Sequence, residues 1–133
     1  SVHNGPTWLF VQMPDSATVT NLAPDMSTVA RLSKDFGVTG LACFALTGAQ
    51  PEVHIRCFCP AINVPEDPVT GSANASLPTY LAHTGLLERT GRAYTSSQGR
   101  ELGRDGSVYV RTDGARTEIG GQAVTVIDGE IRL

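Results

Sequence analysis

The sequence of 133 residues has little charge, and above all little lysine. Charged residues make up 17% of the chain, the net charge is −3, and Lys34 is the only lysine. No two basic residues are adjacent, so the sequence predicts no positive patch that could hold the phosphate backbone of a nucleic acid. The longest apolar runs, such as residues 41–46, fall far short of the ~20 residues that span a bilayer. The composition therefore predicts neither a nucleic acid nor a membrane as a partner.

Cysteine is scarce as well, with Cys43, Cys57 and Cys59 as the three examples. An odd number does not suit a disulfide framework, and the paired cysteine and histidine spacing of a zinc site is missing. We interpret the three as small, reduced, half-buried hydrophobic residues, which favours a cytoplasmic location. There is no nicotinamide-binding fingerprint. A pyridoxal-type cofactor would need a lysine, and Lys34 lies on the outer face of a predicted helix. We therefore expect neither a metal nor any other cofactor.

Enough apolar residues are present to build a core. Hydrophobic residues make up 41% of the chain, and its length suits a single domain over residues 1–133. The 14 glycines favour many turns and hence many short strands.

Periodicity predicts about nine strands and two helices. The strands are expected at residues 8–13, 18–22, 38–46, 52–59, 90–98, 107–112, 117–119, 122–127 and 131–133. The helices are expected at residues 24–37 and 71–83, and the second is apolar almost all round, which is typical of a buried helix. Pro78 lies inside it and predicts a kink. Because strands and helices do not alternate, we predict an α+β fold, with an antiparallel sheet or barrel curled around the central apolar helix.

The densest group of chemically active side chains precedes the second helix. Asp67 and Thr70 come just before its start, and Gly71 and Ser72 begin it. The first N–H groups of a helix lack internal partners and carry partial positive charge, so this start could cradle a carboxylate or phosphate. The purely structural alternative is that Thr70 caps the helix and Asp67 forms a turn before Pro68.

The segment Glu-Asp-Pro-Val-Thr-Gly-Ser-Ala at residues 66–73 closely resembles the signature of the PhzF-like isomerase family of phenazine biosynthesis. Arg-Cys-Phe-Cys-Pro at residues 56–60 matches a stretch that the family carries just upstream of this signature. Downstream, three further landmarks come in family order: Gln98-Gly99 with Gly103-Arg104, Gly-Gly-Gln-Ala-Val at residues 120–124, and residues 129–133 at the end of the chain.

The resemblance implies one half of a diaminopimelate-epimerase-like fold, in which two like-built halves face each other across an active-site cleft. This chain resembles the second half only. By resemblance, Asp67 and Ser72 are the catalytic candidates, and Thr70, Gly71, Ala73 and Asn74 are expected to bind substrate. Asn74 could instead satisfy the helix start. The family's principal acid–base glutamate lies in the first half, and we do not assign that role to Glu66.

The function that the resemblance implies is the cofactor-free relocation of a proton or hydrogen on a small carboxylate-bearing metabolite. Half of a cleft supplies neither a base nor a closed cavity, so we expect the isolated chain to be inactive. A companion would complete the site, either a first-half polypeptide or a second copy of the chain in a dimer. Two alternatives stay open: a non-catalytic ligand-binding or assembly domain, and an epimerase or racemase, although those relatives carry cysteine where this chain has Ser72.

Three other side chains were weighed for a role in the site. His54 is predicted to lie at the surface or an interface, since it alternates with the cysteines of its strand. For Arg56 we favour a solvated or structural ion pair over a ligand contact, and for Trp8 a place in the core or an interface.

Overall fold

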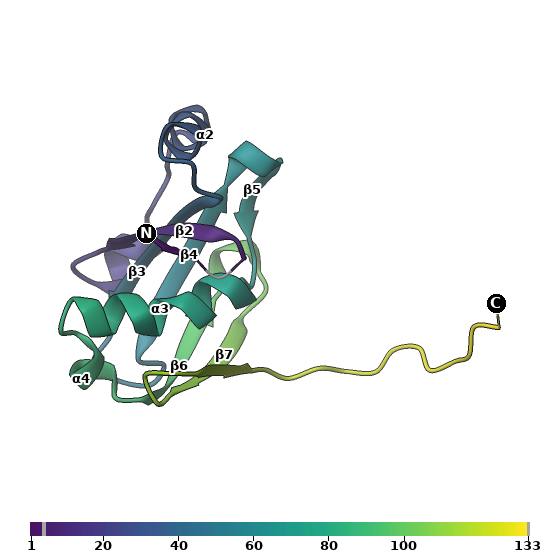
Figure 1. The fold of residues 1–133 in the computed structure, drawn as a ribbon. Coiled ribbons are helices and arrows are strands. Elements are labelled where there is room, and N and C mark those ends of the chain that lie inside the picture. Colours follow the sequence, from purple (N-terminus) through teal and green to yellow (C-terminus); the bar gives the residue numbers. More distant parts are fainter. Residues whose placement is uncertain (4, 133) are drawn as a thin grey trace.

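The structure is a computed structural model that describes residues 1–3 and 5–132 (Figure 1). The strands are β1 (Val2–His3), β2 (Thr7–Gln12), β3 (Gly40–Leu46), β4 (Val53–Cys59), β5 (Val64–Asp67), β6 (Ala93–Gln98), β7 (Gly106–Thr112) and β8 (Thr117–Gly120). The helices are α1 (Ser16–Thr20), α2 (Met26–Asp35), α3 (Gly71–His83) and α4 (Leu87–Thr90), with 3-10 turns η1 (Pro60–Ile62) and η2 (Arg100–Leu102). The predicted α+β class is confirmed.

All of the strands belong to one curled sheet. Its order is β1-β2-β3-β4-β6-β7-β8, and β5 pairs with β4 outside this path. The predicted antiparallel pairing is found at five of the seven strand pairs, but β2 pairs in parallel with β3, and β4 in parallel with β6. Parallel neighbours need a long crossover. Here α1 and α2 form the first crossover, while β5 and α3 lie within the second.

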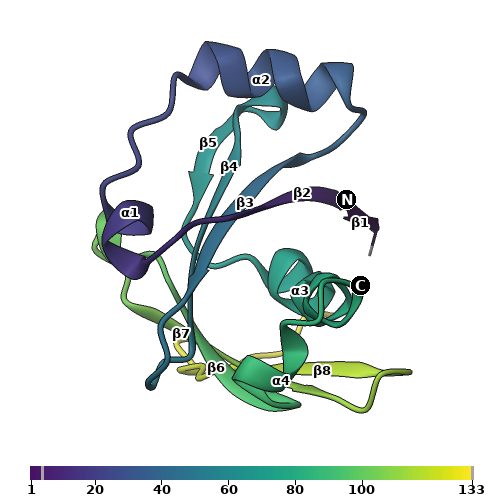
Figure 2. The same ribbon diagram turned by 90° about the vertical axis from the view of Figure 1, so that its left-hand side faces the viewer.

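The main core lies between α3 and one face of the sheet (Figure 2). Ala73, Leu77 and Leu81 of α3 are fully buried and share a cluster with side chains of β2, β3, β4, β6 and β7. Because strands alternate their side chains, Ala42 and Phe44 of β3 belong to this core. The helix predicted at residues 71–83 is confirmed with those bounds.

A second, smaller cluster lies on the opposite face, under α2. It contains Val29 of α2 together with Cys43 of β3 and Phe58 of β4. Cover on both faces explains why every residue of β4 is buried. All three cysteines are free and buried, which confirms their assignment as reduced hydrophobic residues. Burial raises the pKa of Cys43 and of Cys59 to about 11, so neither is a ready nucleophile.

Residues 18–22 do not form the predicted strand. They overlap the short helix α1, whose start is capped by the Asp15 carboxylate, which accepts a hydrogen bond from the Thr18 N–H at 2.7 Å. An aspartate cap can convert a short alternating segment into a turn of helix, and the alternation alone could not reveal this. The start of the strand predicted at residues 90–98 is also wrong, since Thr90 ends α4 and β6 begins at Ala93.

The predicted strands at residues 122–127 and 131–133 are not formed in the described residues. Residues 121–132 have no regular structure and lead away from the domain (Figure 1), while Leu133 lies outside the described residues. Their four β-branched apolar side chains, Val124, Val126, Ile127 and Ile131, are 86–89% exposed. The pattern is that of a strand, but no partner strand meets it.

Within residues 1–3 and 5–132, none of the helices combines the length and apolar character needed to cross a membrane.

Candidate functional site

The start of α3 is joined to the end of β5 by a short polar loop. Asp67 ends β5, Pro68 and Val69 follow, and Thr70 occupies the cap position of the helix. The Thr70 side chain makes no capping bond. Its hydroxyl instead donates to Asp67 Oδ2 at 2.8 Å. The loop therefore holds the Asp67 carboxylate beside the helix start, and simple capping by Thr70 does not describe it.

Three backbone donors at the helix start are unused. Among residues 1–3 and 5–132, no group accepts a hydrogen bond from the N–H of Gly71, Ser72 or Ala73. The next N–H, of Asn74, donates to the Thr70 carbonyl at 3.1 Å and begins the helical pattern. With the positive end of a 13-residue helix behind them, these donors suit an anion.

Ser72 lies beside these donors and is oriented by Trp8. The Trp8 indole Nε1–H donates to Ser72 Oγ at 3.0 Å. Because an indole nitrogen only donates, the serine oxygen accepts this bond and its own proton stays free for another acceptor. Trp8 is almost fully buried, so its expected place in the core is confirmed, and its tie to the candidate site was not foreseen.

Two other predicted binding residues point into the protein. Ala73 is fully buried in the main core, so only its backbone can reach a ligand. Asn74 is also fully buried, and its Nδ2 donates to the Thr70 carbonyl at 2.9 Å and to Gln98 Oε1 at 3.0 Å. The Asn74 side chain therefore supports the helix start.

Gln98, which sequence reasoning did not assign to the site, lies at its centre. This residue ends β6, is 1% exposed, and bonds to Asp67, Thr70 and Asn74. The available signal was its place in the Gln98-Gly99 landmark, which came with no role attached.

Both carboxylate oxygens of Glu66 are engaged by Arg56. Arg56 Nε and Nη2 donate to the two carboxylate oxygens of Glu66 at 2.8 and 2.7 Å. This pairing raises the pKa of Arg56. Both side chains are about nine-tenths buried, so the structural ion pair that we favoured for Arg56 is confirmed.

The expected surface position of His54 is wrong, since its side chain is fully buried. Its Nδ1 lies 2.8 Å from Ser16 Oγ and 3.1 Å from Arg100 Nη2, while Nε2 lies 3.0 Å from Glu101 Oε1. A guanidinium can only donate, so Nδ1 accepts and the proton of the neutral ring is on Nε2. Burial lowers the pKa of His54. The alternation of β4 could not reveal this, because the strand is covered on both faces.

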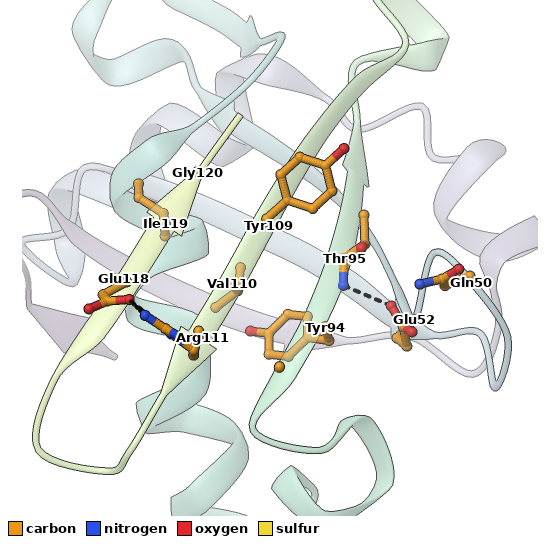
Figure 3. A pocket seen from close by; sticks show the side chains of 11 residues that line it. Gln50, Glu52, Tyr94, Thr95, Tyr109, Val110, Arg111, Glu118, Ile119 and Gly120 are labelled. Atoms are coloured by element: carbon orange, nitrogen blue, oxygen red, sulfur yellow. Dashed lines mark hydrogen bonds and ion pairs between the residues drawn. The ribbon is translucent and has the colours of Figure 1, made fainter. Parts of the chain in front are cut away.

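A hollow of about 470 Å³ lies away from these residues. It crosses the outer side of β6, β7 and β8, and Figure 3 shows Tyr109, Arg111 and Glu118 along it. Glu52 also lines it and accepts a hydrogen bond from the Thr95 N–H at 2.7 Å. No residue predicted for the site lines this groove. Its charged pair, Arg111 and Glu118, is exposed and already neutralised internally.

The sequence pattern of the phenazine biosynthesis-like proteins, PhzC-PhzF, matches residues 1–129. This chain belongs to the PhzC-PhzF family. The resemblance drawn from residues 66–73 and the later landmarks is thereby confirmed. The curled α+β half-barrel is likewise shared with solved structures of the family.

Three similar proteins illustrate the PhzF relationship. The trans-2,3-dihydro-3-hydroxyanthranilate isomerase of Pseudomonas chlororaphis is 37% identical over 98% of this chain and 46% of its own length. A crystal structure of a PhzF family protein from Enterococcus faecalis is 27% identical, with a TM-score of 0.70 over 93% of this chain and 44% of that one. A structure from Pseudomonas aeruginosa described as a predicted epimerase, 20% identical with a TM-score of 0.56 over 93% of this chain and 44% of that one, shares the fold.

The chain spans only part of such proteins. It covers 36% of the length of an Escherichia coli relative and 47% of the length of one from Clostridium acetobutylicum. Several of these relatives, the one from Pseudomonas chlororaphis among them, are named isomerases.

Proposed function

We propose that this chain forms one wall of the active site of a PhzF-like isomerase, which relocates a proton on a small carboxylate-bearing metabolite without a cofactor. In this proposal α3 is the central helix of one half of a diaminopimelate-epimerase-like fold. The observation that carries the proposal is the arrangement at the start of α3. Three N–H groups without an acceptor in the described part of the chain, together with the Ser72 hydroxyl, follow an Asp67 carboxylate that Thr70 holds in place.

The site would favour different ligand groups at its two ends, an anion at the helix start and a hydrogen-bond donor at Asp67. The free N–H groups of residues 71–73 and the positive helix end suit the ligand carboxylate. Asp67 would repel that carboxylate but can accept a hydrogen bond from a hydroxyl or amino group. The relative from Pseudomonas chlororaphis is named for a substrate that carries all three groups. We assign Ser72, whose proton is free, to holding the ligand and passing a proton along it.

The facing wall is proposed to come from outside these residues. A proton transfer at carbon needs a positioned base, and the Arg56 pairing occupies both oxygens of Glu66. The family's other half would supply the base, either as a first-half polypeptide or as a second copy of this chain in a dimer. The isolated chain is then expected to bind ligand but not to turn it over.

Binding of 3-hydroxyanthranilate, followed by nuclear magnetic resonance of the backbone amides, tests this proposal. The probe should shift the amide signals of residues 71–73, and 2-aminophenol, which lacks only the carboxylate, should not. Asp67→Asn and Ser72→Ala should each weaken binding about tenfold while the fold, followed by circular dichroism, is kept. Unchanged binding in both variants would reject the assignment.

A second measurement separates an isomerase from a non-catalytic binding domain. The chain is mixed with the first half of the Pseudomonas chlororaphis relative, and deuterium incorporation from heavy water into that relative's named substrate is followed. Incorporation that depends on both polypeptides and on Asp67 supports the isomerase. Tight binding without incorporation supports a binding or assembly role. An epimerase of the cysteine type is disfavoured, because Ser72 occupies the helix start and the described cysteines are buried.

A further inference from the structure

We propose that Gln98 is a positioning residue that fixes the orientation of the Asp67 carboxylate, an inference that rests on the proposed function for the identity of the ligand. Gln98 reaches this loop from the end of β6, 28 residues after Thr70. Its side chain is 1% exposed, so its bonds do not compete with water.

All four hydrogen-bonding positions of the Gln98 amide are used. Oε1 accepts from the Thr70 N–H at 2.9 Å and from Asn74 Nδ2 at 3.0 Å. Nε2 donates to the Asp67 carbonyl and to Thr70 Oγ1, both at 2.8 Å. The amide cannot be turned over, since the Thr70 N–H can only donate and the Asp67 carbonyl can only accept.

The fixed orientation of the Gln98 amide also fixes which oxygen of the Asp67 carboxylate is hydrogen-bonded. Because Thr70 Oγ1 accepts from Gln98, its own proton is committed to Asp67 Oδ2, at 2.8 Å. The chain of donors therefore runs from Gln98 through Thr70 to one oxygen of Asp67. The other oxygen, Oδ1, has no partner in the described part of the chain and is left for a ligand hydroxyl or amino group.

Gly99 allows Gln98 to come this close. Its φ is +91°, and a Cβ at this position would clash with the Pro68 carbonyl oxygen. Gly106, which pairs with Gln98 across β6 and β7, leaves room in the same way for the Val69 side chain. The end of β6 and the loop at residues 67–70 are thus packed directly on each other.

The test compares two probes, 3-hydroxyanthranilate and benzoate, which share the carboxylate but differ in the groups that Asp67 would bind. Gln98→Glu keeps the acceptor side of the amide and reverses the donor side that faces Asp67 and Thr70. The added charge affects both probes alike, so the ratio of their affinities is the measured quantity. We expect Gln98→Glu to lower the affinity for 3-hydroxyanthranilate relative to that for benzoate about tenfold. Gln50→Glu, which makes the same change in the groove of Figure 3, should leave this ratio unchanged.

Combination with Asp67→Asn shows whether Gln98 acts through the carboxylate. If it does, Gln98→Glu lowers the ratio less than twofold further once Asp67 is already changed. A ratio that Asp67→Asn lowers and Gln98→Glu leaves alone would overturn the proposal, as would fully additive effects. If Gln98→Glu does not fold, Gln98→Met, which is neutral and of similar length, should give the same loss of preference.

A readout without ligand separates this proposal from the failure of the proposed function. The χ1 angle of Asp67 is measured by three-bond couplings in the free chain. We expect one rotamer in the wild type and in Gln50→Glu, and averaging among rotamers in Gln98→Glu. A single Asp67 rotamer in Gln98→Glu contradicts the positioning role, whichever probe binds. Failure of both probes to bind, with the rotamer change observed, rejects only the proposed function.

Discussion

Two adjacent carboxylates, Glu66 and Asp67, have been given opposite roles by their surroundings. Glu66 meets the buried guanidinium of Arg56 with both oxygens. Asp67 uses one oxygen for Thr70, and its other oxygen has no partner among residues 1–3 and 5–132. The same side-chain chemistry thus serves architecture at one residue and ligand binding, as we propose, at the next.

Because His54 is buried, we predict that the domain loses stability in mild acid. The buried ring has a lowered pKa, so as the pH falls below its ordinary value of 6.5 the unfolded chain takes up a proton that the folded chain does not. Protonation would also place a hydrogen on Nδ1 facing the Arg100 guanidinium at 3.1 Å. The free energy of unfolding should therefore fall below pH 6.5, by at most about 1.4 kcal/mol per pH unit.

Urea unfolding at several values between pH 7.5 and 5.5 checks this slope, with His54→Asn and His83→Asn as paired variants. His83 is exposed at the end of α3, so its change should leave the slope in place, whereas His54→Asn should remove it. An equal slope in the wild type and in His54→Asn would show that other groups cause it.

At the scale of elements, Arg56 connects three of them. From β4 it pairs with Glu66 of β5, and its Nη1 donates to the carbonyls of Val19, Thr20 and Leu22 at 2.8 to 3.2 Å, at the end of α1 and just beyond. Removing the guanidinium leaves a buried carboxylate and three carbonyls without their donor. We expect Arg56→Met to destabilise the domain by about 3–5 kcal/mol.

Arg111→Met is the matched control for Arg56→Met. Arg111 also pairs with a glutamate, Glu118, but both side chains are more than 60% exposed. Its loss should leave the free energy of unfolding nearly unchanged, because water already screens this pair. The double variant Arg56→Met with Glu66→Leu should recover part of the lost stability, as measured by urea unfolding. Equal losses at the buried and the exposed pair would contradict the argument.

The elements that the sequence predicts well are those whose own pattern decides them. The helix at residues 71–83 has small and apolar residues on nearly all sides, and β7 alternates buried Val108 and Val110 with exposed Tyr109. Pairing direction is not encoded in such patterns, which is why the two parallel pairs were missed. Residues 122–127, whose state depends on a partner strand, were mispredicted for the same reason, whereas α1 was missed because the neighbouring Asp15 cap decides it.

The candidate site was predictable only where its residues are contiguous. Residues 66–73 identify it because signature, helix start and acid occur in one segment. Gln98 comes from β6 and Trp8 from β2, 28 and 64 residues away from their partners Thr70 and Ser72. No local sequence pattern links residues that far apart. Tertiary contacts of this kind appear only in the folded chain.

At the scale of the whole molecule, residues 121–132 behave as an addition to the domain. Their apolar side chains are almost fully exposed, and they form no part of the sheet or the core. A chain ending at Gly121 should therefore unfold within about 0.5 kcal/mol of the original in urea. A larger loss would mean that this segment contacts the domain in solution.

The four hydrogen bonds of Gln98 couple two separate segments of the sequence, residues 67–74 and Gln98 itself. No other standard side chain of that length offers two donors and two acceptors in one plane. A substitution at Gln98 can therefore persist only with a compensating one at Thr70 or Asn74. A search for further proteins with this site should require both the octapeptide at residues 66–73 and the glutamine at 98. Either one alone would also match sequences that lack the hydrogen bonds between them.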